Sequence, residues 1–180
     1  LDNKSIFGIG SISKMFPATA IMLLSDQGKL NLDEPVATYL PEFKMADERY
    51  KEITVRMLLN HSSGIMGSLY ANSGLYDYPT TLNHDDFLAQ LAKQKLKGDP
   101  GEFSVYCNDG FTLAELVIER ISGMSFSEYI RQNISEPLGM TNTKTPQDDF
   151  DRNRLARTFI NEEETPIETL NLIGAGGVYS

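Results

Sequence analysis

Residues 109–134 constrain the fold most strongly, because they predict two consecutive helices with a sharp break between them. Apolar residues recur at spacings of three and four in the first helix, which indicates one buried helical face. Asp109 is expected to cap this helix and Gly123 to end it, and Ser125 with Glu128 forms a capping box for the second. The buried face comprises Phe111, Ala114, Val117, Ile118 and Ile121. Such faces must pack on other elements, so we expect a mainly helical chain.

Further helices are predicted upstream, joined by long turn-rich connections. We expect helices over residues 15–27, over residues 55–60 with Thr54 as cap, and over residues 84–96 with Asn83 as cap. Strand patterns are few. The two segments that favour strands are residues 5–9 and 170–173.

Two local features modify this helical pattern. Pro17 lies in the first turn of the helix at residues 15–27 and cannot donate to the carbonyl of Ser13, which predicts a kink or a tight turn. Residues 66–81 are rich in Gly, Ser, Tyr and Asn and form a long irregular connection. Connections of this length are often functional, and forming a cleft wall is one role such a loop can take.

The composition is that of one folded globular domain. The chain has 180 residues, of which 41% are hydrophobic and 23% are charged. Its net charge of -9 disfavours binding to a phosphate backbone, so nucleic acid is not an expected partner. The longest apolar run, residues 18–24, is far shorter than the roughly 20 residues that span a bilayer. The chain begins at Leu1 and closes on Ser180, a plausible cap with no helix after it, so we expect both ends to have been cut.

The heptapeptide GSISKMF at residues 10–16 places Ser11 three residues before Lys14. About 0.7 such pairs are expected by chance in this composition, so a helix cap and a surface lysine would explain the spacing alone. On a helix, however, positions i and i+3 share a face, and Lys14 can reach the hydroxyl of Ser11. Burial and the positive helix end would favour the neutral lysine that a general base requires. The amide of Ser11 could also donate to a developing oxyanion.

A second candidate pair, Tyr106 and Asn108, flanks Cys107 in the loop SVYCND. In an extended segment these two side chains share one side, and Cys107 faces the other as a small buried thiol. Tyr106 could relay protons and Asn108 could hold an amide of a substrate. The structural alternatives are a half-buried tyrosine and a turn-forming asparagine.

The two histidines predict neither a metal site nor a cysteine enzyme. His61 follows a predicted helix, where a turn-stabilising hydrogen bond is expected, and His84 is expected on the surface of a first helical turn. Two distant histidines do not make a metal site. A nucleophilic Cys107 is disfavoured because neither histidine lies in a recognisable motif.

Ser11-x-x-Lys14, Tyr106-x-Asn108 and PLGM at residues 137–140 together resemble the serine β-lactamase and penicillin-binding protein family, in its class C and D-alanyl-D-alanine carboxypeptidase-like branch. Further matching segments, such as ITVRMLLNHSSGI and GAGGVYS, extend the resemblance over essentially the whole chain in the family's order. The resemblance implies that Ser11 is the acylated nucleophile and Lys14 its proton acceptor. It also implies that Tyr106 shuttles the proton to the leaving group and that Asn108 contacts a substrate amide.

The resemblance also implies what this chain lacks. The family's third element, a Lys-Thr-Gly or His-x-Gly strand that supplies the second oxyanion donor, would lie beyond Ser180, and most of the antiparallel sheet is missing. We therefore expect the helical lobe plus the nucleophile helix of the β-lactamase/transpeptidase-like α/β fold, as one partial domain over residues 1–180 that is inactive alone. The apolar face left uncovered should cause self-association.

The expected function is a serine hydrolase that forms an acyl-enzyme on β-lactams, D-alanyl peptides of peptidoglycan or small esters, without metal or cofactor. The alternative is a penicillin-binding or scaffold protein of the same fold that does not hydrolyse. By resemblance, the intact protein would be exported or associated with the cell envelope, although no targeting segment is present in this chain.

Overall fold

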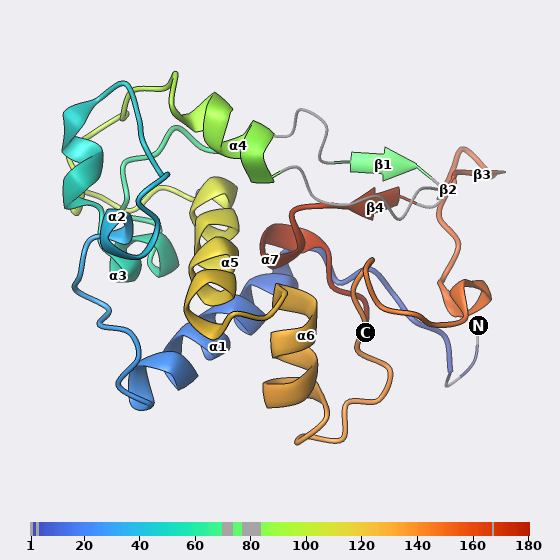
Figure 1. The fold of residues 1–180 in the computed structure, drawn as a ribbon. Helices are drawn as coiled ribbons and strands as arrows, with labels where there is room; N and C mark the ends of the chain where they lie inside the picture. The colour runs from blue at the N-terminus through green and yellow to red at the C-terminus, as the bar shows by residue number, and fades with distance from the viewer. Residues whose placement is uncertain (1, 3, 70–73, 77–83, 167) are drawn as a thin grey trace.

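The computed structural model describes residues 2, 4–69, 74–76, 84–166 and 168–180. Within these residues helices predominate and strands are short (Figure 1), which confirms the expected mainly helical chain. The helices are η1 (Gly10–Lys14), α1 (Met15–Asp26), α2 (Val36–Tyr39), η2 (Glu48–Glu52), α3 (Val55–Leu59), α4 (His84–Leu91), α5 (Asn108–Ser122), α6 (Phe126–Ile130), η3 (Arg131–Ser135), η4 (Arg152–Arg154) and α7 (Ile173–Gly176). The strands are β1 (Gly74–Tyr76), β2 (Phe159–Ile160), β3 (Glu163–Glu164) and β4 (Glu168–Leu170).

Helix α5 forms the centre of the hydrophobic core. It packs against α1, α2, α3, α6 and α7, and Figure 1 shows α1, α5 and α6 grouped in the middle of the molecule. Its predicted apolar stripe is buried, except that Ile121 is only partly covered. Gly123 ends the helix at a φ of 70°, as expected for a left-handed stop. Ser125 Oγ accepts a hydrogen bond from the amide of Glu128 and so caps α6, as predicted.

The strands form two small antiparallel pairs, β1 with β4 and β2 with β3. The predicted strand at residues 170–173 is correct only at its first residue, because β4 ends at Leu170 and α7 begins at Ile173. Packing explains the difference. The chain folds back so closely that a Cβ on Gly177 would lie 2.6 Å from the carbonyl oxygen of Leu170. The turn that this glycine allows replaces the second half of the strand.

The segment at residues 5–9 is extended but pairs only through isolated bridges. Ile6 pairs in parallel with Leu155, and Gly8 pairs antiparallel with Tyr179. This arrangement brings residues near the two ends of the chain together, and Figure 1 shows the N- and C-terminal segments on the same side of the molecule. The first residues before η1 are therefore fixed from both sides.

Two predicted helix boundaries are wrong, and tertiary contacts explain both. The helix predicted over residues 84–96 ends at Leu91, after which the carbonyl of Gln94 accepts from the amide of Ala46 instead of continuing a helix. Asp109 does not cap α5, because its carboxylate accepts from the amide of Leu69. The predicted cap at Asn83 lies outside the described residues. Thr54 does cap α3, accepting from the amide of Met57.

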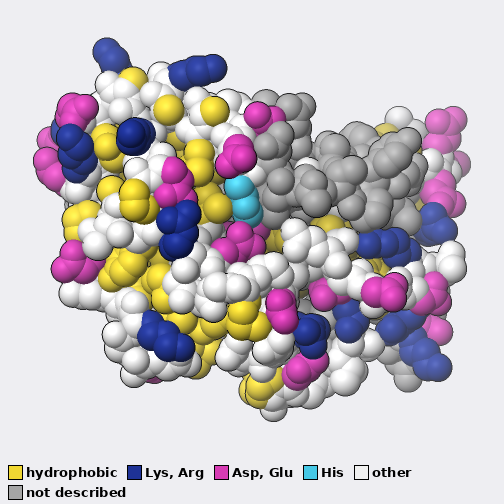
Figure 2. Space-filling model, viewed as in Figure 1, with side chains coloured by type: hydrophobic (Ala, Val, Ile, Leu, Met, Phe, Trp, Pro, Cys, Tyr) yellow, Lys and Arg dark blue, Asp and Glu magenta, His cyan; other side chains and the backbone are white. Residues whose placement is uncertain are grey.

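Charged side chains of both signs are interspersed over the surface seen in Figure 2. Some of these charges neutralise each other in local ion pairs, such as Arg56 with Asp33. Among the residues with described positions, none of the helices has the length and apolar character needed to cross a membrane.

Candidate active site

The Ser-x-x-Lys pair lies on the tight turn η1, directly before α1. Gly10 has a φ of 52°, which a glycine tolerates, and it turns the chain so that Ser11 is exposed. Ser13 is fully buried, and its Oγ accepts from the amide of Val178 at 3.0 Å. The 3₁₀ geometry of η1 confirms the tight turn that Pro17 predicts. Ser11 is thus exposed to solvent on a turn that the contact between Ser13 and Val178 holds in place.

Lys14 is buried, and its ammonium group is directed at Ser11. Its Nζ donates to Ser11 Oγ at 3.2 Å, to Asn108 Oδ1 at 2.6 Å and to the carbonyl oxygen of Ala175 at 2.5 Å. An ammonium group has three donors and no acceptor, so these three oxygens match it fully. The ammonium also lies 4.9 Å from the centre of the Tyr106 ring, within the range of a cation–π contact.

Tyr106 completes the contact set of Ser11. Its hydroxyl donates to Ser11 Oγ at 2.6 Å, although 53% of the residue is exposed. Burial of the phenol opposes its ionisation, but the hydrogen bonds to Lys14 and Ser11 and the positive charge of Lys14 outweigh it and lower the pKa of Tyr106. The hydroxyl of Tyr106 is therefore within hydrogen-bond distance of Ser11, and its pKa is below that of an ordinary tyrosine.

Asn108 links the nucleophile region to the loop before β1. Its Oδ1 accepts from Lys14, and its Nδ2 donates to Ser68 Oγ at 2.8 Å. The structure therefore brings together all four residues that the sequence singles out. Sequence reasoning missed Ser68 and the carbonyl of Ala175. The only signal for the latter is the run of small residues GAGGVYS, which permits close approach of the backbone.

Cys107 is buried away from the nucleophile, on the side expected for it. The residue is 1% exposed, its Sγ donates to the carbonyl of Gly67 at 3.3 Å, and burial raises the pKa of the thiol. His61 Nδ1 accepts from the backbone amide of Cys107 at 3.1 Å. The histidine therefore contacts the backbone of the loop, which does not provide the imidazole–thiol pair that a cysteine nucleophile needs.

His84 is not the surface residue that the sequence predicts. Its side chain is 18% exposed, with Nε2 at 3.4 Å from Glu115 Oε1 and Nδ1 at 3.6 Å from Glu119 Oε2. Burial lowers the pKa of His84, but the hydrogen bond and the charges of these glutamates outweigh it and raise the pKa. The reason is that His84, the first residue of α4, lies against Glu115 and Glu119 of α5, which draw the imidazole inward.

Glu115 supports the turn that contains Ala175, and sequence reasoning missed it. The residue is completely buried, and burial raises the pKa of its carboxyl. Its Oε2 accepts from the amide of Gly174 at 2.7 Å, in the first turn of α7. The next residue, Ala175, supplies the carbonyl that accepts from Lys14. A buried carboxylate thus holds the turn that positions this carbonyl.

The hollow beside Ser11 is small. Its volume is about 100 Å³, whereas pockets for small molecules usually have about 300–1,000 Å³. Its lining residues are Gly10, Ser11, Asn108, Leu170, Leu172, Ala175 and Gly176. The hollow beside Ser11 is therefore too small, among the described residues, to enclose a small molecule.

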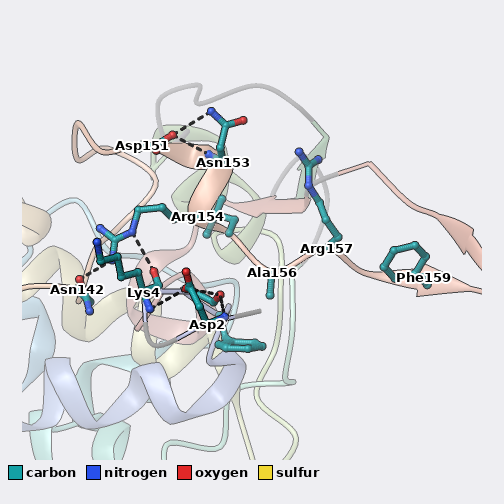
Figure 3. A pocket seen from close by; sticks show the side chains of 12 residues that line it. Asp2, Lys4, Asn142, Asp151, Asn153, Arg154, Ala156, Arg157 and Phe159 are labelled. Atoms are coloured by element: carbon teal, nitrogen blue, oxygen red, sulfur yellow. Dashed lines mark hydrogen bonds between the residues drawn. The ribbon is translucent and has the colours of Figure 1, made fainter.

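A larger hollow of about 1070 Å³ lies elsewhere, between the N-terminal segment and residues 142–159 (Figure 3). Lys4, Arg154 and Asp151 are among the charged groups in its walls, and Arg154 is engaged by the side chain of Asn142 and the carbonyl of Lys4. It includes none of the four candidate residues. Over the described ranges, the acidic, histidine and cysteine side chains form no cluster that could bind a metal ion.

Comparisons with known proteins relate this chain to one family. A family model described as Beta-lactamase matches residues 1–180. Penicillin-binding protein 4* of Bacillus subtilis (strain 168) is 36% identical over 149 residues, which are 80% of this chain and 31% of that protein. A class C β-lactamase in complex with cefoxitin has the same fold, with a TM-score of 0.82 at 23% identity, over 99% of this chain and 48% of its own.

A third similar protein is an amidase. The D-amino acid amidase from Ochrobactrum anthropi SV3, complexed with D-phenylalanine, gives a TM-score of 0.81 at 28% identity, over 100% of this chain and 58% of its own. The chain thus spans between about a third and three fifths of the length of these three proteins. Because the family model matches the chain from end to end, the protein belongs to the Beta-lactamase family, within its serine β-lactamase and penicillin-binding protein branch.

Proposed function

We propose that this chain carries the nucleophile and the proton-handling residues of a serine hydrolase that forms an acyl-enzyme at Ser11. The observation that carries the proposal is the convergence on Ser11 Oγ of the Tyr106 hydroxyl, at 2.6 Å, and Lys14 Nζ, at 3.2 Å. A serine hydroxyl is a weak nucleophile until a neighbouring group takes its proton. The substrates proposed are β-lactams, D-alanyl peptides and small esters, each of which offers one reactive carbonyl.

In this proposal Tyr106 accepts the proton of Ser11, although the resemblance gives that role to Lys14. Lys14 Nζ donates to three uncharged oxygens, which is the pattern of a protonated lysine. Tyr106, in contrast, has a lowered pKa, so its phenolate forms more readily than that of an ordinary tyrosine. The positive charge of Lys14 then stabilises the phenolate before the reaction and the serine oxygen during it.

The proton and electron balance of acylation is simple. The step requires Tyr106 as its phenolate. The Ser11 O–H bond breaks as its proton moves to the phenolate oxygen, the serine oxygen forms a bond to the substrate carbonyl carbon, and the π electrons of the carbonyl move to its oxygen. The bond from that carbon to the leaving nitrogen or oxygen then breaks. Tyr106 returns the proton to the leaving group, which leaves an ester at Ser11.

The backbone amide of Ser11 is the proposed first donor to the oxyanion. It lies in the first turn of η1, where a backbone N–H has no acceptor within the helix. Removing one donor of an oxyanion hole costs about 10²–10³-fold in rate, so a second donor is needed. The small hollow at Ser11 and the greater length of the relatives support our proposal that further chain supplies this donor and the missing cleft wall. The 180-residue chain, as one partial domain, should then be inactive alone.

Slow deacylation defines the second candidate function, a penicillin-binding protein that is acylated but hydrolyses the ester poorly. The name of the Bacillus subtilis relative supports this candidate, and the amidase and β-lactamase neighbours support hydrolysis. We also propose, from the same relative, that the whole protein acts at the cell envelope on peptidoglycan peptides. The net charge of -9 gives no reason to propose nucleic acid as a partner.

Intact mass spectrometry after incubation with benzylpenicillin tests the proposal. The whole protein, the 180-residue chain and a Ser11→Ala variant of the whole protein should be compared. A persistent adduct that the variant lacks supports a penicillin-binding protein, and a transient adduct with hydrolysed drug supports a β-lactamase. An adduct in the Ser11→Ala variant refutes Ser11 as the nucleophile. An adduct on the 180-residue chain refutes the claim that further chain is required.

A further inference from the structure

His61 has a left-handed backbone conformation that its neighbours must stabilise. Its φ is 63°, in the left-handed region that non-glycine residues rarely adopt. Such a conformation costs on the order of 1–2 kcal/mol. Strained residues of this kind persist where neighbouring groups fix them, and they are common at functional sites. In this conformation His61 contacts the loop that carries Tyr106.

Two hydrogen bonds from His61 hold the backbone on either side of Tyr106. The carbonyl oxygen of His61 accepts from the amide of Val105 at 3.0 Å, and its Nδ1 accepts from the amide of Cys107 at 3.1 Å. In an extended segment the amides of residues i and i+2 point to the same side. His61 therefore acts as a short strand partner, with its side chain replacing the second backbone acceptor.

The imidazole also packs against the tyrosine itself. The ring centres of His61 and Tyr106 are 4.6 Å apart, with an angle of 33° between the ring planes. Because Tyr106 is 53% exposed, little other material restrains its ring. The tip of the ring is fixed by Ser11 Oγ, and one face is fixed by His61. The ring of Phe111, with its centre 5.2 Å from that of His61, supports the imidazole in turn.

We propose that His61 is a positioning residue for Tyr106, and that it acts only as the neutral imidazole with its proton on Nε2. The inference rests on the proposed function, because it assigns a role relative to the tyrosine that exchanges the proton. An Nδ1 that carried a proton could not accept from the amide of Cys107. Protonation of His61 should therefore release one of the two bonds that hold the tyrosine loop.

The electrostatic surroundings favour the neutral form. Burial lowers the pKa of His61, and the positive charges of Lys14 on η1 and Lys97 after α4 lower it further. Among the described residues, the titratable side chain that packs directly on its ring is the Tyr106 phenol. A negative charge on Tyr106 would raise the pKa of His61, so the titrations of the two groups should be coupled.

A measurement that needs no substrate tests the tautomer. The chain has only two histidines, so long-range ¹H–¹⁵N spectra of the ¹⁵N-histidine protein can be assigned with a single His84→Gln variant. We expect His61 to be the Nε2–H tautomer and to titrate below 6.5, whereas His84 titrates above it. An Nδ1–H tautomer, or titration of His61 above 6.5, would overturn the proposal even if the protein proves not to be a hydrolase.

The functional test uses the whole protein with p-nitrophenyl acetate and benzylpenicillin. His61→Gly keeps the left-handed backbone but removes the acceptor and the ring, and should lower the acylation rate by about tenfold or more. His61→Asn tolerates the same φ and places an amide oxygen near the position of Nδ1, so it should recover most of the rate and remove the His61 ionisation from the pH profile.

The matched control is Ser104→Ala, which removes the hydrogen bond from Ser104 Oγ to the carbonyl of Asn60 at 2.9 Å. This bond joins the same two segments, but at the residue before Val105 rather than on either side of Tyr106. The Ser104→Ala variant should retain most of the rate. Equal rates for wild type and His61→Gly refute the positioning role. Absence of any acylation, with the NMR result as expected, would refute the proposed function and not the tautomer of His61.

Discussion

Asp109 should make the free energy of unfolding decrease as the pH rises from about 4 to about 6. The residue is 1% exposed; its Oδ1 accepts from the amide of Leu69 at 2.7 Å, and among the described side chains and amides nothing pairs with its Oδ2. Burial raises the pKa of this carboxyl from 3.8 to about 6, against the opposing influence of the Leu69 amide and of Lys97. The folded protein therefore retains a proton that the unfolded chain releases.

The sign and size of the effect follow from proton linkage. Between 3.8 and about 6 the folded state binds one more proton than the unfolded state, so stability falls with rising pH. The whole interval corresponds to about 3 kcal/mol. Above pH 6 the carboxyl of Asp109 is ionised in both states, and its burial lowers the free energy of unfolding by this amount. Below pH 4 the carboxyl is protonated in both states, and the effect disappears.

Urea denaturation of wild type and Asp109→Asn at pH 4, 5, 6 and 7 measures this effect. The difference in unfolding free energy between the two proteins should shift by about 3 kcal/mol in favour of Asp109→Asn from pH 4 to pH 7. Asp149→Asn, at an exposed aspartate, is the control and should show no such trend. Parallel pH profiles for wild type and Asp109→Asn would refute the reasoning, whatever their absolute stabilities.

Three further results are expected. Tyr106→Phe should lower acylation of the whole protein by about 10²-fold or more while leaving thermal unfolding nearly unchanged, because the phenol is exposed; equal rates would contradict its role. Glu115→Gln should lower the pKa of His84, since the hydrogen bond and charge of Glu115 raise it, and NMR titration checks this. Met15 and Met22, exposed by 67% and 46% on α1, should promote association of the 180-residue chain, so Met15→Gln/Met22→Gln should shift it towards monomer in light scattering.

The sequence predicts the parts of this molecule that depend on local pattern. The apolar stripe of α5, its stop at Gly123 and the cap of α6 are all correct, because spacing and capping act within a few residues. The four candidate residues are predicted because their motifs, together with further segments along the chain, resemble those of a known family. Their roles remain predictions, but the structure does bring them together.

The failures of prediction occur where a distant contact decides the outcome. Asp109 has the chemistry of a cap but accepts from Leu69, forty residues away. His84 is drawn inward by the glutamates of α5, which no local pattern reveals. The carbonyl of Ala175 contributes to the site through the backbone, which has no side-chain signature in a sequence. The burial of Glu115 is not predicted, because a glutamate on a helix is usually exposed.

The charge of Lys14 contributes to lowering the pKa values of both rings beside Ser11. The oxygens that accept from Lys14 belong to a hydroxyl, an amide and a backbone carbonyl, none of which neutralises it. On Tyr106, burial raises the pKa and the charge of Lys14 lowers it. On His61, burial and the charge of Lys14 both lower the pKa. The same cation thus makes the Tyr106 phenol easier to ionise and the His61 imidazole harder to protonate, which are the directions that the proposed proton transfer and positioning require.

Lys14→Gln, which keeps an N–H donor without the charge, should therefore raise the pKa values of Tyr106 and His61 together. Lys14→Arg, which keeps the charge, should leave both lowered. NMR titration of ¹³C-tyrosine and ¹⁵N-histidine protein measures the two groups in one sample, with Tyr106→Phe to assign the tyrosine. If only one of the two pKa values rises in Lys14→Gln, the groups do not share this charge as their common cause. A joint rise would mean that the buried lysine acts mainly as a fixed cation, with the proton of Ser11 passing to Tyr106.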